Sequence, residues 1–132
     1  MYGYVLYDVR KFILGGKAEF SILQEPNIEY EYIVKRNQKG NCWFVSVLRD
    51  GSYVYGGYID STLNYRRGTK GNLDVNDTAI KGLLWILRHK GDLPPVVKIK
   101  HRGKCSVCNR KLKDELSVQW GIGPVCRKKL GL

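Results

Sequence analysis

The sequence predicts an α+β protein: an antiparallel, β-rich N-terminal body with one packed helix, followed by a small cysteine-bearing module. Alternation of apolar and polar residues dominates the first 60 residues, one clear helical pattern follows at about 77–90, and three of the four cysteines fall in the last 28 residues. We therefore divide the 132-residue chain into a body, residues 1–95, and a C-terminal module, residues 96–132.

The body is expected to fold from antiparallel hairpins, because apolar and polar residues alternate along several short segments. Gly15 and Gly16 interrupt the first alternating stretch and predict a tight turn there. Turn residues at 39–41 and 50–51 separate the later segments, and residues 56–72 predict an irregular edge or loop. The strands are expected at residues 2–9, 17–23, 29–34, 43–48 and 53–55.

One amphipathic helix is expected at about 77–90. Asp77 offers an N-cap side chain, apolar residues recur at i, i+3, i+4 and i+7 from Ile80, and Gly91 stands just after the last turn. This pattern predicts that one helix face packs on the sheet. Two prolines then separate the helix from a short strand at 96–100 that leads into the cysteines.

The formal net charge of +11 belongs mostly to the C-terminal third of the chain. Residues 1–87 hold 11 Lys and Arg against 9 Asp and Glu, whereas residues 88–132 hold 12 against 3. Such asymmetry indicates an anionic partner, with nucleic acid first, an acidic protein surface second and an anionic membrane third. A basic face that only aids solubility is the alternative.

Several classes of protein are not indicated by the sequence. No apolar run approaches the roughly 20 residues that span a bilayer, and the first residues lack a secretory signal pattern, so we expect a cytoplasmic protein without membrane contact. The chain has no G-x-S-x-G, P-loop, H-E-x-x-H or deaminase motif. We therefore expect a binding protein and not an enzyme.

The spacing Cys105-x2-Cys108-x17-Cys126 is the strongest chemical signal in the sequence. A C-x2-C turn lets two thiolates converge on one metal ion, and distant residues complete a tetrahedron. Thiolates with an imidazole select zinc over magnesium or calcium. Pro124 predicts the start of a short helix to about Leu130, which places Cys126 in its first turn. The module is therefore predicted to be a treble-clef-like finger with one structural Zn²⁺ per chain.

His101 is the expected fourth ligand, because its x3 spacing before Cys105 can reach the site. His89, or a residue of the body, could take that place. A redox pair is the alternative for the C-x2-C turn, but it lacks a βαβ context and leaves Cys126 without a role. Cys42 precedes an apolar strand and is expected to be a buried, inert thiol.

The finger resembles a C-terminal motif of a family of small bacteriophage and bacterial proteins of unknown function. The likeness rests on HRGKCSVCNRKL at residues 101–112, on Ser117, and on GIGPVC at residues 121–126. Asn109 stands where that family usually has glycine, and asparagine tolerates a left-handed turn conformation. WFVSVL at residues 43–48 and the helix with a tryptophan look similar in kind to the family's body. The resemblance implies a phage or prophage origin and a zinc finger, and no known activity.

Cations surround the predicted metal site, ten of them within 32 residues. Alternating cations before the first cysteine would share one strand face, and the last three would project from the terminal helix. Trp120 is the best aromatic candidate in the finger, or alternatively part of its small core. The expected nucleic-acid-binding set is Lys98, Lys100, Arg102, Lys104, Arg110, Lys111, Lys113, Arg127, Lys128, Lys129 and Trp120.

Tyrosines of the body offer a second, weaker signal for single-stranded nucleic acid, because aromatic rings beside cations can stack bases. Ordinary packing of tyrosine in strands is the alternative explanation. The residues concerned are Tyr53, Tyr55, Tyr58 and Tyr65, with Arg66, Arg67 and Lys70 nearby.

Taken together, these patterns predict a nucleic-acid-binding module whose zinc finger presents a basic face to phosphates. The alternative is a phage accessory protein that uses the same face to bind and modulate a host or phage protein. The positive charge argues against a protein that mimics DNA, which would need the opposite sign.

Overall fold

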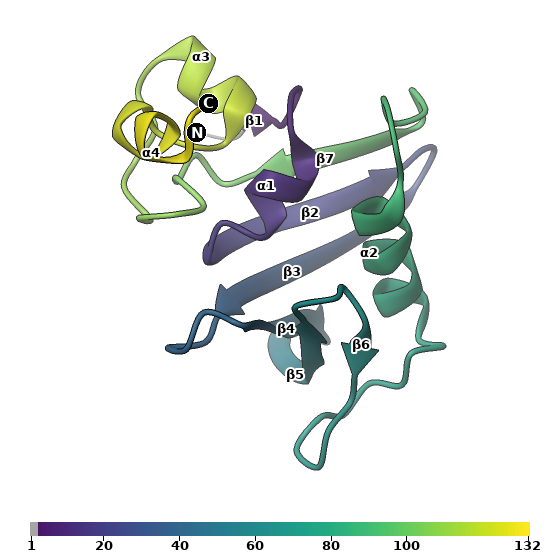
Figure 1. Ribbon diagram of the computed structural model, residues 1–132. Coiled ribbons are helices and arrows are strands. Elements are labelled where there is room, and N and C mark those ends of the chain that lie inside the picture. The colour runs from purple at the N-terminus through teal and green to yellow at the C-terminus, as the bar shows by residue number, and fades with distance from the viewer. Residues whose placement is uncertain (1–2) are drawn as a thin grey trace.

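The computed structural model describes residues 3–132. Seven antiparallel strands form one sheet in the order β1-β7-β2-β3-β4-β5-β6, and helices α1 and α2 lie on one of its faces (Figure 1). The elements in chain order are β1 Gly3–Tyr4, α1 Val9–Ile13, β2 Lys17–Gln24, β3 Ile28–Arg36, β4 Cys42–Arg49, β5 Ser52–Asp60, β6 Tyr65–Arg66, α2 Thr78–Arg88, β7 Val97–His101, α3 Glu115–Trp120 and α4 Pro124–Leu130.

The central strands β2 to β5 form a meander, which confirms the expected antiparallel hairpins. Strand β5 runs to Asp60, five residues beyond its predicted end, and a register shift between Val45 and Ser46 leaves Gly56 of β5 without a paired residue on β4. Cys42 begins β4 opposite Asp60 and is half-buried, so the expectation of a buried thiol is only partly right.

The predicted first strand is wrong over most of its length, and the part on residues 1–2 lies outside the described residues. Only Gly3–Tyr4 pairs, with β7, and Val9–Ile13 form helix α1 instead. The Asp8 carboxylate accepts a hydrogen bond from the Lys11 N–H at 3.0 Å and caps this helix, while Phe12 is fully buried. The residues before this helix are rich in tyrosine and valine, which favours a strand, and five residues are too few to show a helical period.

Helix α2 forms as predicted and covers the sheet. The Asp77 carboxylate accepts a hydrogen bond from the Ala79 N–H at 2.9 Å and forms an ion pair with the Arg49 guanidinium at 2.6 Å. The buried Tyr32 hydroxyl of β3 donates to the Ala79 carbonyl at 2.8 Å, so the first turn is tied to the sheet twice. The inner face, including Leu83, is excluded from solvent.

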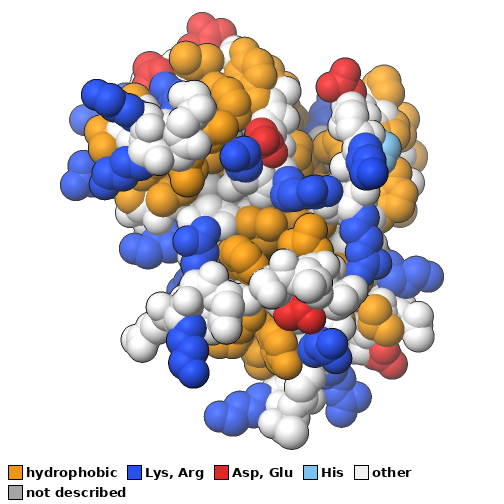
Figure 2. All heavy atoms as spheres, viewed as in Figure 1, with side chains coloured by type: hydrophobic (Ala, Val, Ile, Leu, Met, Phe, Trp, Pro, Cys, Tyr) orange, Lys and Arg blue, Asp and Glu red, His pale blue; other side chains and the backbone are white. Residues whose placement is uncertain are grey.

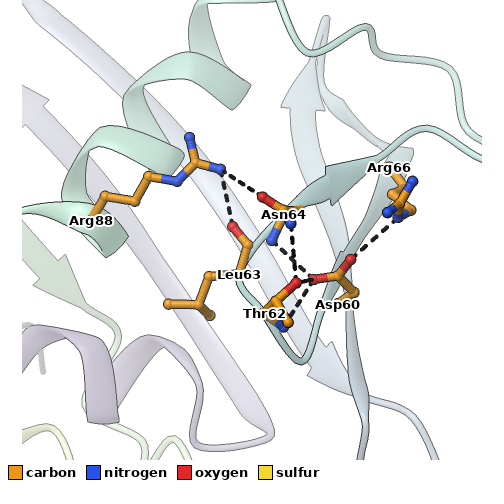
Figure 3. Close-up of polar contacts among 6 residues, drawn as sticks. All are labelled: Asp60, Thr62, Leu63, Asn64, Arg66 and Arg88. Carbon is orange, nitrogen blue, oxygen red and sulfur yellow. Dashed lines mark hydrogen bonds and ion pairs between the residues drawn. The ribbon is translucent and has the colours of Figure 1, made fainter.

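The turn between β5 and β6 is held by one carboxylate (Figure 3). Asp60 accepts hydrogen bonds from the backbone N–H groups of Asn64 and Thr62, both at 3.0 Å. These bonds, that of Asn64 above all, lower the pKa of Asp60 to about 2. Arg88 at the end of α2 donates to the Leu63 carbonyl at 3.1 Å, so the turn also anchors the helix.

The C-terminal part is joined to the body more closely than the predicted boundary at residue 96 suggests. Strand β7 is inside the sheet, between β1 and β2, so a separate module can only begin after residue 101. We call residues 102–132 the finger. It lies against β1 and α1 at one end of the sheet (Figure 1), where the Lys17 N–H donates to the Ser106 carbonyl at 2.6 Å.

Candidate metal centre

The three C-terminal cysteines converge on one point. The Sγ atoms of Cys105, Cys108 and Cys126 all lie within 4.8 Å of one another, and two of the three residues are buried. Thiolates on a tetrahedral zinc ion, at about 2.3 Å from the metal, stand about 3.8 Å apart. The observed clustering is compatible with this spacing, so the three cysteines can hold a metal ion.

The turn that carries the first two cysteines is a tight hairpin. Lys104 and Lys111 form a β-bridge across it, and the Cys105 N–H donates to the Arg110 carbonyl at 2.8 Å. Asn109 has a φ of 66°, the left-handed conformation expected for the position that carries glycine in the resembling family. This turn directs both sulfurs of the C-x2-C pair to the same side.

Backbone N–H groups surround the Cys105 sulfur. Gly123 and Val107 donate to it at 3.3 and 3.4 Å. Burial alone would raise the pKa of this thiol, but the hydrogen bonds, led by that of Gly123, outweigh burial and lower it. The site is therefore built to hold a thiolate at Cys105.

Cys126 lies in the first turn of α4, as predicted, and the pKa of its thiol is shifted in the opposite direction to that of Cys105. Burial raises the pKa of its thiol to about 12, and the neighbouring sulfurs of Cys108 and Cys105 add to the effect. Three thiolates so close together repel one another unless a cation lies among them. The cluster thus has the chemistry of a metal centre, because bound metal is what would allow all three sulfurs to be ionised.

His101 does not join this cluster, so the prediction that it supplies the fourth ligand is corrected. Its Nδ1 accepts a hydrogen bond from the Gly103 N–H at 2.9 Å, and its Nε2 lies 2.6 Å from the Val118 carbonyl. Both ring nitrogens are therefore engaged, and the fully buried ring packs 5.8 Å from that of Phe12. The x3 spacing would allow the His101 side chain to reach the cysteines, but at the end of β7 it points into the seam between the finger and the body.

His89 is not a ligand in this arrangement either, because its Nε2 lies 3.0 Å from the Asp92 carbonyl and its ring stacks on Trp85. Within residues 3–132, the metal-ligating group that includes cysteines contains only these three residues.

The three cations of β7 and its end do not belong to a free basic face. They do share one side of the strand, as expected, but this side is the face of the sheet that carries the glutamates of β2 and β3. The ion pairs are Lys98–Glu25 at 3.3 Å, Lys100–Glu29 at 3.9 Å, Arg102–Glu31 at 3.2 Å and Arg102–Glu19 at 3.6 Å. Because each of these cations already has a carboxylate partner, they are weaker candidates for phosphate binding than cations without one.

Arg127 also has a structural role instead of the predicted exposed one. Its guanidinium is partly buried and donates to the Ser117 hydroxyl and to the Ile122 carbonyl, both at 3.0 Å. It therefore fastens α4 to α3 and to the loop between them.

Six of the predicted cations remain exposed on the finger. Among the residues that the structure describes, none of the six has a carboxylate within ion-pair distance. Figure 2 shows Lys and Arg side chains along the outer edge of this part of the molecule. They are Lys104, Arg110, Lys111, Lys113, Lys128 and Lys129.

The aromatic candidates are less available than the cations. Trp120 is half-buried, packs on the small apolar cluster of the finger, and its ring centroid lies 4.9 Å from that of Tyr7. In the body, the Tyr65 hydroxyl donates to the Leu73 carbonyl at 2.7 Å, and Tyr53 is the most exposed of the four tyrosines. The structure thus favours packing for most of these rings.

The fold and the cluster define the class: a small mixed α/β protein with an antiparallel sheet and a C-terminal three-cysteine group that can hold a metal ion. The model of a family of unknown function, DUF6011, matches residues 99–131, which include all three cysteines. No curated protein and no solved structure matches the chain. No helix in residues 3–132 is long and apolar enough to cross a membrane.

Proposed function

We propose that the three cysteines hold one Zn²⁺ per chain and that this ion stabilises the finger. Sulfur ligands favour zinc over the hard cations magnesium and calcium. A cysteine hairpin followed by a ligand in the first turn of a terminal helix resembles a treble clef, with helix α3 between the two. A finger of this size depends on the metal for its fold, because it buries too little apolar surface alone.

We further propose that the finger binds nucleic acid through its exposed cations. The observation that carries this proposal is the contrast between two groups of cations. Those of β7 are paired with glutamates, whereas the six on the finger have no acidic partner in the described chain. A Zn²⁺ ion with three thiolates contributes a charge of about −1, so the finger stays positive. Unpaired cations on a rigid element suit phosphate binding.

Binding to single-stranded DNA, duplex DNA and RNA, measured over a range of salt concentrations, tests this function. Replacing Arg110, Lys111 and Lys113 with glutamine should weaken binding to every sequence and reduce the slope of log K against log salt by about 2 to 3. The matched control replaces three exposed lysines of the body, Lys35→Gln, Lys39→Gln and Lys81→Gln, and removes the same charge.

The two triple variants separate a defined interface from a diffuse charge effect. An equal loss in both would mean that net charge, and not the finger, drives binding. Absence of binding to all three nucleic acids at about 50 mM salt would reject the proposal, because phosphate contacts are strongest at low salt.

A protein partner is the second candidate, in keeping with the phage accessory role implied by the resemblance. Exposed apolar side chains beside the cations favour it: Leu116, Val125 and Leu130 are 47%, 59% and 44% exposed. An acidic host or phage protein that is captured by the chain, and released by the finger triple variant, would support this candidate when nucleic acid does not bind.

A further inference from the structure

A hollow of about 340 Å³ opens directly on the cysteine cluster. All three cysteines line it, together with Gly123 and Leu112, so one side of the cluster borders this hollow; Cys105 and Cys126 are themselves buried, and Cys108 is partly exposed. Four of the six unpaired cations stand around the same hollow. They are Arg110, Lys111, Lys113 and Lys129.

Among residues 3–132, no side chain in this hollow stands ready as a fourth metal ligand. Asp114 lines it, but its carboxylate accepts hydrogen bonds from the Ser117 N–H at 3.1 Å and the Ser117 hydroxyl at 2.7 Å, and thereby caps α3. Lys129 stands three residues after Cys126 on α4, on the helix face where a second helical ligand would stand. A lysine ammonium has three donors and no acceptor, so it attracts an anion instead of binding a metal.

We propose that the fourth ligand comes from outside the chain and is an anionic oxygen donor, a phosphate group held in the hollow by these cations. The inference rests on the proposed zinc site, since three thiolates leave one position of a tetrahedral ion unfilled. Phosphate fits the surroundings because a guanidinium and three ammonium groups supply many donors for its oxygens. The group can be free phosphate or the terminal phosphate of a nucleic-acid strand, since both present the same chemistry.

The distribution of cations on α4 argues for a site and against general attraction. Lys128 and Lys129 are adjacent, both are exposed, and both lack an acidic partner in the described residues, yet only Lys129 lines the hollow. Binding of a phosphate in the hollow should therefore depend on Lys129 and not on Lys128. Attraction by a diffuse positive field would depend on both lysines equally. This pair provides a charge-matched comparison within one helix.

Cobalt(II) in place of zinc gives the full-length chain a spectroscopic signal at this position, because its d–d absorption depends on the number and kind of ligands. Titration with inorganic phosphate should change these bands in a saturable way. We expect Lys129→Ala to raise the phosphate Kd about tenfold, the loss of one charge-assisted hydrogen bond, and Lys128→Ala to leave it within about twofold.

Two further titrations identify the source of the phosphate. One uses an oligonucleotide with a 5′-phosphate, and the other uses the same oligonucleotide with a 5′-hydroxyl. A change of the bands with the 5′-phosphate strand but not with the 5′-hydroxyl strand supports the proposal and assigns the strand end. A change with inorganic phosphate but with neither strand also supports it and assigns the free anion.

Three results would overturn the inference. Bands that stay unchanged with phosphate, while cobalt is bound, would mean that the position is filled or closed. Bands that change in Asp114→Asn without added anion would make Asp114 the fourth ligand. If cobalt and zinc both fail to bind, the proposed zinc site itself fails, and this outcome is distinct because no d–d bands are present at all.

Discussion

His101 connects three segments at the seam between the sheet and the finger. Its imidazole accepts a hydrogen bond from Gly103, lies within hydrogen-bond distance of the Val118 carbonyl, and is fully buried against Phe12. Burial lowers the pKa of the ring, which keeps it neutral and able to accept from Gly103. The histidine is therefore a structural residue of the seam.

This role predicts that His101→Ala retains one bound zinc per chain and lowers the free energy of unfolding by about 2 to 4 kcal/mol. The loss has two causes: the buried Gly103 N–H loses its partner and the Val118 carbonyl keeps only that of Gly121, and a cavity forms beside Phe12. Metal content and urea unfolding measure the two effects, and Cys105→Ser is the control that should lose the metal. A folded His101→Ala chain without zinc would restore the histidine as a ligand.

At the residue scale, the sequence predicted the three cysteines because their spacing alone makes convergence favourable. It did not predict the partners of Lys98 and Arg102, since the glutamates that pair with them lie about 70 residues earlier and meet them only through the sheet. The orientation of the His101 side chain could not be predicted either. Its spacing from Cys105 limits how far the side chain can reach but does not determine where it points.

Among the elements, α2 depends on an N-cap that has two functions. Asp77 accepts the Ala79 N–H of the first turn and also pairs with Arg49 of β4, which fixes the helix on the sheet. We expect Asp77→Ala to lower the free energy of unfolding by about 1 to 2 kcal/mol through loss of the cap. Asp74→Ala is the control, because the Asp74 carboxylate accepts a hydrogen bond from the Asn76 N–H, which lies before the helix. Equal effects of the two substitutions in urea unfolding would contradict this role.

The elements that were predicted correctly have strong local signals, and the missed ones are short. Helix α2 has an N-cap and a full apolar face, and α4 begins with proline. Helices α1 and α3 have only 5 and 6 residues and depend on the side chains of Asp8 and Asp114 for their caps. Helices this short are too brief to show a period and form because they pack at the seam.

At the scale of the whole molecule, the charge asymmetry has a structural basis. Nine of the 12 basic residues in the last third fall into two groups, three paired with glutamates and six exposed on the finger without an acidic partner in the described residues. The net charge of each region can be counted from the sequence. Which cations are paired cannot, because pairing depends on which cations the sheet places opposite glutamates. Four of the unpaired cations stand around the cysteines, so metal and anion chemistry are concentrated at one end of the molecule.

The finger and the body also share their stability across the seam. The Leu6 N–H donates to the Gln119 carbonyl at 2.8 Å, the Lys17 N–H donates to Ser106, and Gly121 lies against the Phe12 ring with no room for a side chain. We therefore expect removal of the metal with a chelator to loosen β1 and α1 together with the finger, because these segments lose their partners when the finger unfolds.

Amide hydrogen exchange before and after chelation measures this coupling. Exchange in residues 102–132 should become much faster, and exchange in α1 at least about tenfold faster, while β4 and β5 at the far side of the sheet keep their protection. Restoration of protection by added zinc is the control for reversible loss of the metal. Faster exchange in the finger alone would show that the body is stable independently and that the seam contributes little.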